Sequence, residues 1–199
     1  MANENQLFSL EDIFTKCIFR IPDYQRGYAW EKNQLIDFWE DIINLPDDLN
    51  HYTGMLSLDR VPKEDYSSWT GESWIFEKDY VAYYIVDGQQ RLTTFVILVQ
   101  SFVDFIRSLD EYSEKADRDI YIGDETLDRT IERFLYVVNR KYPTLVAFKF
   151  GYCDAPSYNY LKKVIMNKDI VCDIEETFYT FNLKKAKQFS AGKGKSLSL

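Results

Sequence analysis

The alternation of hydrophobic and polar positions predicts a chain in which short strands and helices follow one another. Ser9, followed three positions later by Asp12, is a helix-capping signature and predicts a short helix over residues 9–16. A strand is predicted over 16–21, and apolar residues at helical spacing over 35–43 predict an amphipathic helix. The first part of the chain is therefore expected to place one strand between two helices.

The middle of the chain is expected to supply further strands and the longest apolar helix. Runs rich in Tyr, Val and Ile predict strands over 52–58, 73–77 and 80–86, with a loop over 61–71. The segment from Gln89 to Leu109 is apolar almost all round, apart from a narrow polar stripe. A helix with that distribution of side chains is expected to lie buried at the centre of the fold.

The composition changes over residues 110–124, which are charged and weakly hydrophobic, and a subdomain boundary is predicted there. The segments predicted beyond the boundary are a helix over 125–140, a strand over 145–150 and helices over 157–166 and 174–189. Residues 190–199 have low complexity and are expected to be disordered. The predicted organisation is a domain over 1–110, a mainly helical extension over 111–189 and a disordered tail.

Composition and charge restrict the partners of this chain. With 199 residues and 17% aromatic content, it can bury a full core. It carries 24 basic and 32 acidic side chains, a formal net charge of −8, which argues against a protein that coats nucleic acid through a generally basic surface. Any contact with DNA would be local, in a groove where four arginines could converge: Arg20, Arg26, Arg60 and Arg91.

The counts of histidine and cysteine exclude several kinds of site. The single His51 excludes mechanisms that need two imidazoles in one chain, such as HNH nuclease centres. Cys17, Cys153 and Cys172 form no C-x-x-C pair, which indicates neither a disulfide framework nor a zinc ribbon. The expected compartment is the reducing cytoplasm. The sequence shows no secretory signal and no apolar stretch of the roughly 20 residues that a bilayer requires, so no membrane contact is expected.

The most informative segment is Tyr-Tyr-Ile-Val-Asp-Gly-Gln-Gln-Arg-Leu-Thr-Thr over residues 83–94, where a hydrophobic strand gives way to the buried helix. The first N–H groups of a helix lack intrahelical partners and the macrodipole is positive there, so such a junction can bind an anion. Gly88 permits a tight turn, while Gln89 and Gln90 offer amide groups. Arg91 presents a planar fork suited to phosphate.

Asp87, at the end of the predicted strand, could bind a divalent metal or position a water molecule. A simpler interpretation is that Asp-Gly is a common turn pair, that Asp87 caps the helix and that Arg91 pairs with one of the many carboxylates. Composition and spacing leave both interpretations open. Four consecutive polar residues that open an otherwise apolar helix are nevertheless hard to explain by packing.

A second segment, Ile-Pro-Asp-Tyr-Gln-Arg-Gly-Tyr-Ala-Trp over residues 21–30, is dense in groups that stack or donate hydrogen bonds. Gln25 and Arg26 supply hydrogen bonds and positive charge. Flat faces for a base are offered by Tyr24, Tyr28 and Trp30. The alternative is that these aromatic side chains only anchor the loop to the core.

Together the two segments resemble the N-terminal domain of GmrSD-type, modification-dependent (type IV) restriction enzymes and related phage-defence proteins. The residues that carry the first motif are Ile21, Pro22, Tyr24, Gln25, Arg26, Tyr28 and Trp30, and the second motif runs from Asp87 to Thr94. A Tyr-x-Gly segment over 52–54 lies between them at matching spacing. The resemblance is close over residues 7–110 and is one of pattern only as far as residue 189.

This resemblance implies a ParB/sulfiredoxin-like α+β fold, with a small mixed sheet, surrounding helices and a helical segment after it. In that superfamily an arginine-containing motif at a helix N-terminus holds nucleotide phosphates. The catalytic candidates are Asp87, Gln90 and Arg91. The candidates for binding nucleotide and phosphate are Tyr24, Gln25, Arg26, Gly88, Gln89, Gln90 and Arg91.

The implied function is a nucleotide-binding module of a restriction or phage-defence system that hydrolyses nucleoside triphosphates or acts as a DNA-nicking phosphodiesterase. The expected cofactor is GTP or ATP with Mg²⁺, and Asp87 is the candidate metal ligand because oxygen ligands suit Mg²⁺. The alternative is a non-catalytic nucleotide-sensing or DNA-binding regulatory module that acts with a separate HNH nuclease domain. A purely structural role in a defence complex is a third interpretation.

Members of this family commonly continue into a second half that carries an HNH nuclease, which a chain with one histidine cannot contain. The helical pattern over residues 182–189 runs into a Ser/Gly/Lys tail, which suggests a truncated gene product, an engineered fragment or a split subunit. The expected partners are a nucleotide, modified double-stranded DNA and an HNH nuclease domain or subunit on another polypeptide.

Overall fold

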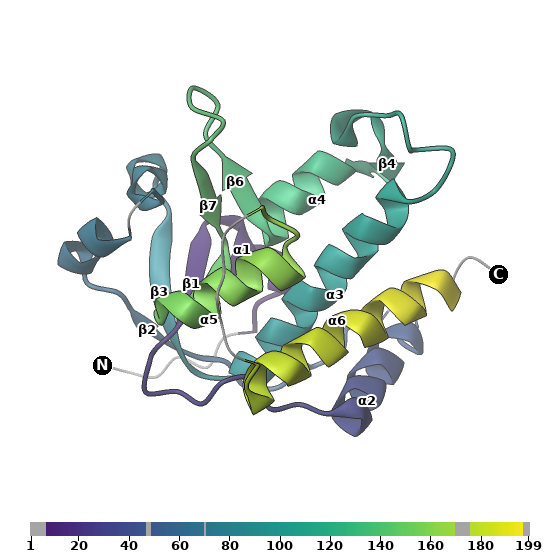
Figure 1. Ribbon diagram of the computed structural model, residues 1–199, viewed down its shortest axis with the longest axis horizontal. Coiled ribbons are helices and arrows are strands. Elements are labelled where there is room, and N and C mark those ends of the chain that lie inside the picture. Colours follow the sequence, from purple (N-terminus) through teal and green to yellow (C-terminus); the bar gives the residue numbers. More distant parts are fainter. Residues whose placement is uncertain (1–6, 47–48, 70, 170–175, 197–199) are drawn as a thin grey trace.

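A computed structural model describes residues 7–46, 49–69, 71–169 and 176–196. It has an α+β architecture in which helices surround a small mixed sheet, as predicted (Figure 1). The strands are β1 (Cys17–Ile21), β2 (Ser57–Arg60), β3 (Val81–Asp87), β4 (Tyr121–Ile122), β5 (Glu125–Thr126), β6 (Tyr136–Val138), β7 (Val146–Phe148) and β8 (Phe150–Tyr152). The α-helices are α1 (Leu10–Thr15), α2 (Lys32–Ile43), α3 (Gln89–Arg107), α4 (Leu127–Phe134), α5 (Ala155–Tyr160) and α6 (Phe178–Ser196). The shorter helical turns are η1 (Lys63–Ser68), η2 (Ser73–Lys78), η3 (Asp117–Asp119) and the π-helical η4 (Leu161–Ile165).

The main sheet has four strands in the order β2-β3-β1-β8. β1 runs parallel to both of its neighbours, with Phe19 opposite Tyr83 of β3 and Phe150 of β8. β2 is antiparallel to β3 and places Ser57 opposite Asp87. β1 and β3 therefore both end at the same edge of the sheet.

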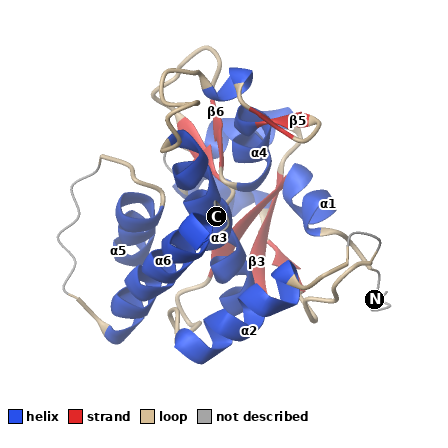
Figure 2. Cartoon of the chain, turned by 90° about the vertical axis from the view of Figure 1, so that its right-hand side faces the viewer, coloured by secondary structure: helices blue, strands red, loops and turns tan. Residues whose placement is uncertain are grey.

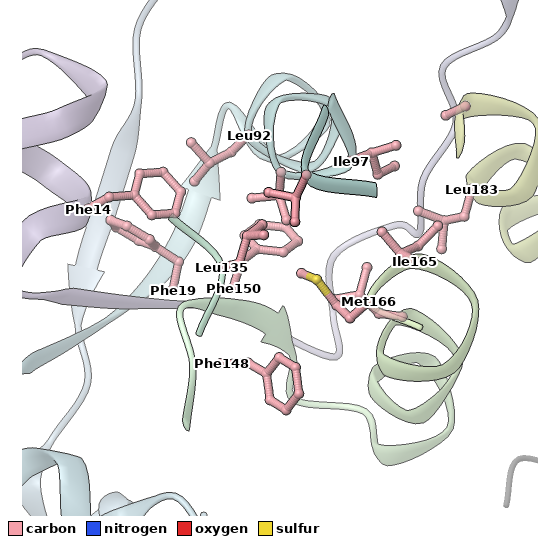
Figure 3. Close-up of a cluster of buried hydrophobic side chains, with 14 of the residues drawn as sticks. Phe14, Phe19, Leu92, Ile97, Leu135, Phe148, Phe150, Ile165, Met166 and Leu183 are labelled. Atoms are coloured by element: carbon pink, nitrogen blue, oxygen red, sulfur yellow. The ribbon is translucent and has the colours of Figure 1, made fainter. Parts of the chain in front are cut away.

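The hydrophobic core lies between the sheet and the helices and draws on side chains from both halves of the chain. The ring centroids of Phe14 and Phe19 are 5.1 Å apart, and those of Phe14 and Phe134 are 5.7 Å apart. Figure 3 shows Phe14, Phe19 and Leu92 from the first half beside Leu135 and Phe150 from the second. Burial of these apolar side chains is the main source of stability.

α3 is the central helix, and α6 lies beside it along much of its length (Figures 1 and 2). Part of the polar stripe predicted on α3 is buried, at Gln100 and Ser101. Asp104 of α3 accepts hydrogen bonds from Asn167 Nδ2 at 2.9 Å and from Lys187 Nζ of α6 at 2.5 Å. This polar cluster fixes the position of α6 on the central helix.

Several predicted elements are confirmed by the structure. The capping box of Ser9 and Asp12 is present at the start of α1. The predicted strand over 16–21, the helix over 35–43 and the buried helix from Gln89 correspond to β1, α2 and α3. Capping chemistry and helical periodicity are local signals, and they locate these elements well.

Other elements differ from the prediction because tertiary packing decides them. Residues 73–77 form the 3₁₀ helix η2 and not a strand, with Ile75 buried against Ile18 of β1. Of the strand predicted over 52–58, only the last two residues, Ser57 and Leu58, belong to β2. The helix predicted over 125–140 ends at Phe134, because residues 136–138 pair with β7 as an antiparallel hairpin.

The C-terminal region also differs from the prediction. α6 continues through Ser190 to Ser196, where disorder was expected, and residues 197–199 lie outside the described part of the chain. Ser190 is buried, and the Lys193 ammonium lies 5.7 Å from the Trp39 ring and 5.4 Å from the Phe189 ring. These contacts extend the helix beyond what its Gly and Ser content favours. The start of the helix predicted over 174–189 also falls partly outside the described residues.

The part of the chain after residue 110 is not only helical, since it contributes β8 to the main sheet as well as the two hairpins β4–β5 and β6–β7. The subdomain boundary itself stays a prediction. Across the described ranges, no helix combines the length and the apolar character needed to cross a membrane.

Candidate functional site

The carboxyl ends of β1 and β3 bring the two sequence motifs together. β1 leads directly into the loop over 22–30, and β3 leads directly into α3. Since the two strands are parallel neighbours, both motifs emerge at the same edge of the sheet. In open sheets with parallel strands this edge is where ligands commonly bind.

A cleft of about 330 Å³ opens between the two motifs. Its lining residues are Gln25, Arg26, Trp30, Val86, Asp87, Gly88, Gln89, Gln90 and Arg91. Every predicted catalytic or phosphate-binding residue is therefore in its wall except Tyr24. The side chain of Tyr24 is 76% exposed and does not line the cleft.

The floor of the cleft includes the N-terminus of α3. Gly88 occupies the N-cap position with φ at +92°, a left-handed conformation that favours glycine. Among the described residues, no side chain caps this end by a hydrogen bond, and the first turn contains no acidic residue. Asp87 Oδ1 instead accepts a hydrogen bond from the Gly88 N–H at 2.8 Å. The positive end of a helix of 19 residues thus faces the cleft.

Two arginines add positive charge to this cleft. Arg26 is exposed on the loop, and Arg91 lies half-buried in the first turn of α3. No carboxylate in the described ranges forms an ion pair with either of them. The Nη2 atom of Arg91 donates a hydrogen bond to the carbonyl of Met55. The simpler interpretation, in which Arg91 pairs with a carboxylate, does not agree with the contacts among the described residues.

Three glutamines attach the loop to the end of β3 and the start of α3. Gln90 accepts a hydrogen bond from the Ala29 N–H at 2.8 Å and donates one to the Gly27 carbonyl at 3.1 Å. Gln89 Nε2 donates to the Arg26 carbonyl at 3.1 Å, and Gln25 Nε2 donates to the Val86 carbonyl at 3.0 Å. The two motifs thus form one connected polar wall, in which most of the glutamine side-chain amide groups are hydrogen-bonded to backbone groups.

The Oε1 atom of Gln89 has no hydrogen-bond partner among the described residues, although the residue is only 7% exposed. The orientation of this amide is fixed, since only its NH₂ group can donate to the Arg26 carbonyl. An unpaired buried amide oxygen costs about 1–3 kcal/mol. The wall of the cleft therefore contains an acceptor that its own protein partners leave unsatisfied.

The aromatic residues of the loop have different roles. Tyr28 is buried, and its hydroxyl lies 2.7 Å from Thr94 Oγ1, so it anchors the loop to α3. Burial raises the pKa of this hydroxyl, which stays neutral. Trp30 packs edge-on against Phe38 with ring centroids 5.8 Å apart and also borders the cleft. Only Trp30 of these rings is placed to contact a ligand in the cleft.

The four arginines that were expected to share one groove do not converge. Arg20 is 2% exposed, and its Nη2 lies 2.7 Å from Glu72 Oε2 and 3.0 Å from the Tyr158 hydroxyl. Arg60 is exposed but lies outside the cleft, because the antiparallel register of β2 places Ser57 beside Asp87. A buried strand residue was mistaken for a surface residue, since the partner of Arg20 is 52 positions away in the sequence.

A metal site formed by protein groups alone is not present in the described part of the chain, where no three His, Cys, Asp or Glu residues gather. Asp87 is exposed and stands alone in the cleft as a carboxylate. Mg²⁺ commonly takes one or two carboxylates together with phosphate oxygens and waters. Asp87 therefore fits Mg²⁺ only jointly with a phosphate-bearing ligand.

Sequence reasoning placed the segment over 52–54 between the two motifs but did not predict its contact with Arg91. Gly54 has φ at +101°, and a Cβ atom there would lie 2.9 Å from Arg91 Cζ. The Met55 carbonyl accepts the hydrogen bond from Arg91. The isolated glycine in a predicted strand was the available signal, because such a glycine often marks a close approach of another group.

The fold and site define a class of protein: a small α+β domain with an electropositive polar cleft at the start of its central helix. The sequence matches the family described as GmrSD restriction endonuclease, N-terminal domain, over residues 5–190. The chain belongs to this family, which places it among the restriction and phage-defence proteins. No curated protein matches the chain.

Proposed function

We propose that the cleft binds the phosphate groups of a nucleoside triphosphate, GTP or ATP, and that the chain is the nucleotide-hydrolysing or DNA-nicking module of a restriction system. The observation that carries this proposal is the convergence of Arg26, Arg91 and the uncapped N-terminus of α3 on one cleft of about 330 Å³. That volume lies in the range of small-molecule sites.

The charges of the cleft favour a phosphate ligand over a cationic one. Two guanidinium groups and the helix dipole face one carboxylate, Asp87, so the local charge is positive although the chain as a whole carries −8. Guanidinium forks bind phosphate oxygens in pairs, and helix N–H groups add further donors. A polyphosphate would satisfy donors that the protein itself leaves open.

The proposed chemistry is attack of water on phosphorus, with loss of the bond to the leaving oxygen. Arg26 and Arg91 would stabilise the charge that develops on the phosphoryl oxygens, often the largest single contribution to such a reaction. Asp87 would position the water, or share Mg²⁺ with the phosphates, in which case the metal neutralises phosphate charge. Gln90 would act indirectly by holding the loop that carries Arg26.

The family supports an interaction with DNA, and we propose that modified double-stranded DNA and a separate HNH nuclease domain or subunit are partners of this module. The cytoplasm is the proposed compartment. Binding of nucleotide without turnover would instead indicate that the module senses nucleotide and regulates a separate nuclease.

The test measures nucleotide binding by calorimetry, hydrolysis of GTP and ATP, and plasmid nicking, all with Mg²⁺. The variants are Asp87→Asn, Arg26→Ala and Arg91→Ala. Arg129→Ala is a matched control, because this exposed arginine lies on α4 outside the cleft. We expect each arginine variant of the cleft to weaken binding by about 10-fold or more, as loss of a charge-assisted hydrogen bond would.

Asp87→Asn is expected to abolish turnover while nucleotide still binds. Equal activity in wild type, Asp87→Asn and Arg91→Ala would refute the catalytic proposal. Absence of affinity for GTP, ATP and tripolyphosphate in the wild-type chain would refute the phosphate site itself.

A further inference from the structure

The segment over residues 54–56, which precedes β2, contacts the start of α3. The Met55 carbonyl accepts a hydrogen bond from Arg91 Nη2, and Gly54 lies against the guanidinium of the same side chain. A Cβ atom at position 54 would be 2.9 Å from Arg91 Cζ and 3.2 Å from Nε, and the first of these distances is closer than real contacts allow. The guanidinium therefore occupies the space that a side chain at this position would need.

The same segment also contacts the N-cap of the helix. A Cβ atom on Gly88 would lie 2.9 Å from Leu56 Cδ1 and 3.2 Å from the Met55 carbonyl oxygen. Two groups of the cleft, the Arg91 fork and the turn at Gly88, thus rest on three consecutive residues. Neither Gly54 nor Met55 lines the cleft.

We infer that Gly54 is a positioning residue: by leaving space for the Arg91 guanidinium, it lets the Met55 carbonyl hold that fork toward the phosphates of the ligand. This inference rests on the proposed phosphate site. A long arginine side chain has much rotamer freedom to lose when it binds. Holding one nitrogen on a backbone carbonyl reduces that loss and leaves the other donors available for phosphate.

Glycine at position 54 has two separable roles. Its positive φ alone makes any other residue strained, which lowers stability without necessarily affecting Arg91. Gly71 offers a matched control, because it also has a positive φ, of +82°, but a Cβ atom added there would meet no described atom within 4 Å. Gly71→Ala should therefore reproduce the backbone strain without the clash.

The experiment is a double-mutant cycle with Gly54→Ala, Arg91→Ala and the double variant, beside Gly71→Ala. Dissociation constants for ATP, GTP and tripolyphosphate with Mg²⁺ are measured by calorimetry, and thermal unfolding reports the folded state. We expect Gly54→Ala to weaken binding by about 10-fold or more, close to the loss from Arg91→Ala. The double variant should bind no more weakly than Arg91→Ala alone, because the two changes remove the same interaction.

Gly71→Ala should bind as wild type does, even with a similar loss of thermal stability. The inference is overturned if Gly54→Ala binds like wild type while Arg91→Ala does not, or if the two losses add fully in the double variant. If Arg91→Ala has no effect, or the wild type binds none of the three probes, the proposed phosphate site fails first and the inference fails with it.

Discussion

Gln89 and Gln90 are adjacent in the sequence but have different roles in the structure. Both ends of the Gln90 amide hold the loop, through the Ala29 N–H and the Gly27 carbonyl. Gln89 uses only its NH₂ group, on the Arg26 carbonyl, and its oxygen remains without a partner in the described chain. Gln90 therefore attaches the loop through both ends of its amide, whereas Gln89 does so through one end only.

Replacement of Gln90 by leucine tests the attachment of the loop. Gln90→Leu removes two hydrogen bonds and leaves two loop backbone groups without partners, so the free energy of unfolding should fall by about 1–3 kcal/mol. Urea denaturation measures this change. Gln188→Leu is a control at an exposed glutamine of α6 and should change stability by less than about 0.5 kcal/mol. An unchanged stability in Gln90→Leu would contradict the attachment role and would leave contact with the ligand as the role of Gln90.

At this scale the sequence predicted the residue types of the site but not their contacts. Arginine, glycine and amide groups around residues 25–26 and 87–91 were identified, and the structure gathers them in one cleft. Tyr24 lies outside this cleft with its side chain exposed, and its binding role stays a prediction. Arg20 was wrongly expected in the same groove, because Glu72 holds it in the interior. Contacts between distant residues leave no trace in a single sequence.

At the scale of the elements, local sequence signals predicted the helices correctly, whereas they did not predict the segments whose conformation depends on pairing with a distant strand. Caps and helical periodicity correctly located α1, α2 and α3. β6 was predicted as helix because the apolar spacing of α4 continues into Leu135 and Val138, whereas pairing with β7 decides its conformation. The segment over 52–56 lacks regular structure, and its Met55 carbonyl accepts a hydrogen bond from Arg91. Elements that depend on a partner were the ones that the sequence could not specify.

The C-terminal end of helix α1 contacts a buried lysine, Lys149, which lies between β7 and β8. Lys149 has no exposed surface, and its Nζ donates to the carbonyls of Phe14 at 2.6 Å and Thr15 at 3.2 Å. The ammonium also lies 4.4 Å from the ring of Tyr80. A cation at the C-terminal end of a helix is favourable, but removing the ammonium from water disfavours its protonated form. Burial lowers the pKa of Lys149 to about 8.

This lowered pKa makes stability depend on pH in a defined window. The folded chain loses the Lys149 proton near pH 8, whereas the unfolded chain keeps it until its ordinary value of 10.5. Between these values the unfolded state binds more protons, so the contribution of Lys149 to the free energy of unfolding rises with pH, by up to about 3 kcal/mol. Below pH 8 both states are protonated and the contribution is constant.

Urea denaturation of wild type and Lys149→Met at pH 7, 8, 9 and 9.5 measures this effect as a difference. Subtracting the two profiles removes the titration of the tyrosines, which both proteins share. The difference should move in favour of wild type as the pH rises above 8. Parallel profiles would show that Lys149 titrates no differently in the folded chain.

At the scale of the whole molecule, a net charge of −8 and an electropositive cleft coexist because the positive groups are concentrated at one edge of the sheet. α6 connects this edge to the rest of the fold. A Cβ atom on Gly27 would lie 2.5 Å from the ring of Tyr179, so the first turn of α6 rests on the motif loop. Lys187 of the same helix binds Asp104 of α3. The site therefore depends on elements from both ends of the chain.

The predicted boundary near residue 110 can be tested by expressing residues 1–110 alone. That fragment keeps both motifs but loses β8, so β1 would become an edge strand that pairs only with β3. It also loses Leu135 and Phe150 from the core, both of which are fully buried in the whole chain. We expect the fragment to show no cooperative thermal transition and poor dispersion of amide signals in its NMR spectrum.

A chain ending at residue 196 keeps every described element and should unfold cooperatively like the whole protein. The chain ending at residue 196 should also bind tripolyphosphate, and the fragment of residues 1–110 should not, because a core that both halves share holds the N-terminus of α3 in place. A fragment of 110 residues that unfolds cooperatively would establish the first half as an independent domain. In that case β8 and α6 would be additions to a site that the first half already forms.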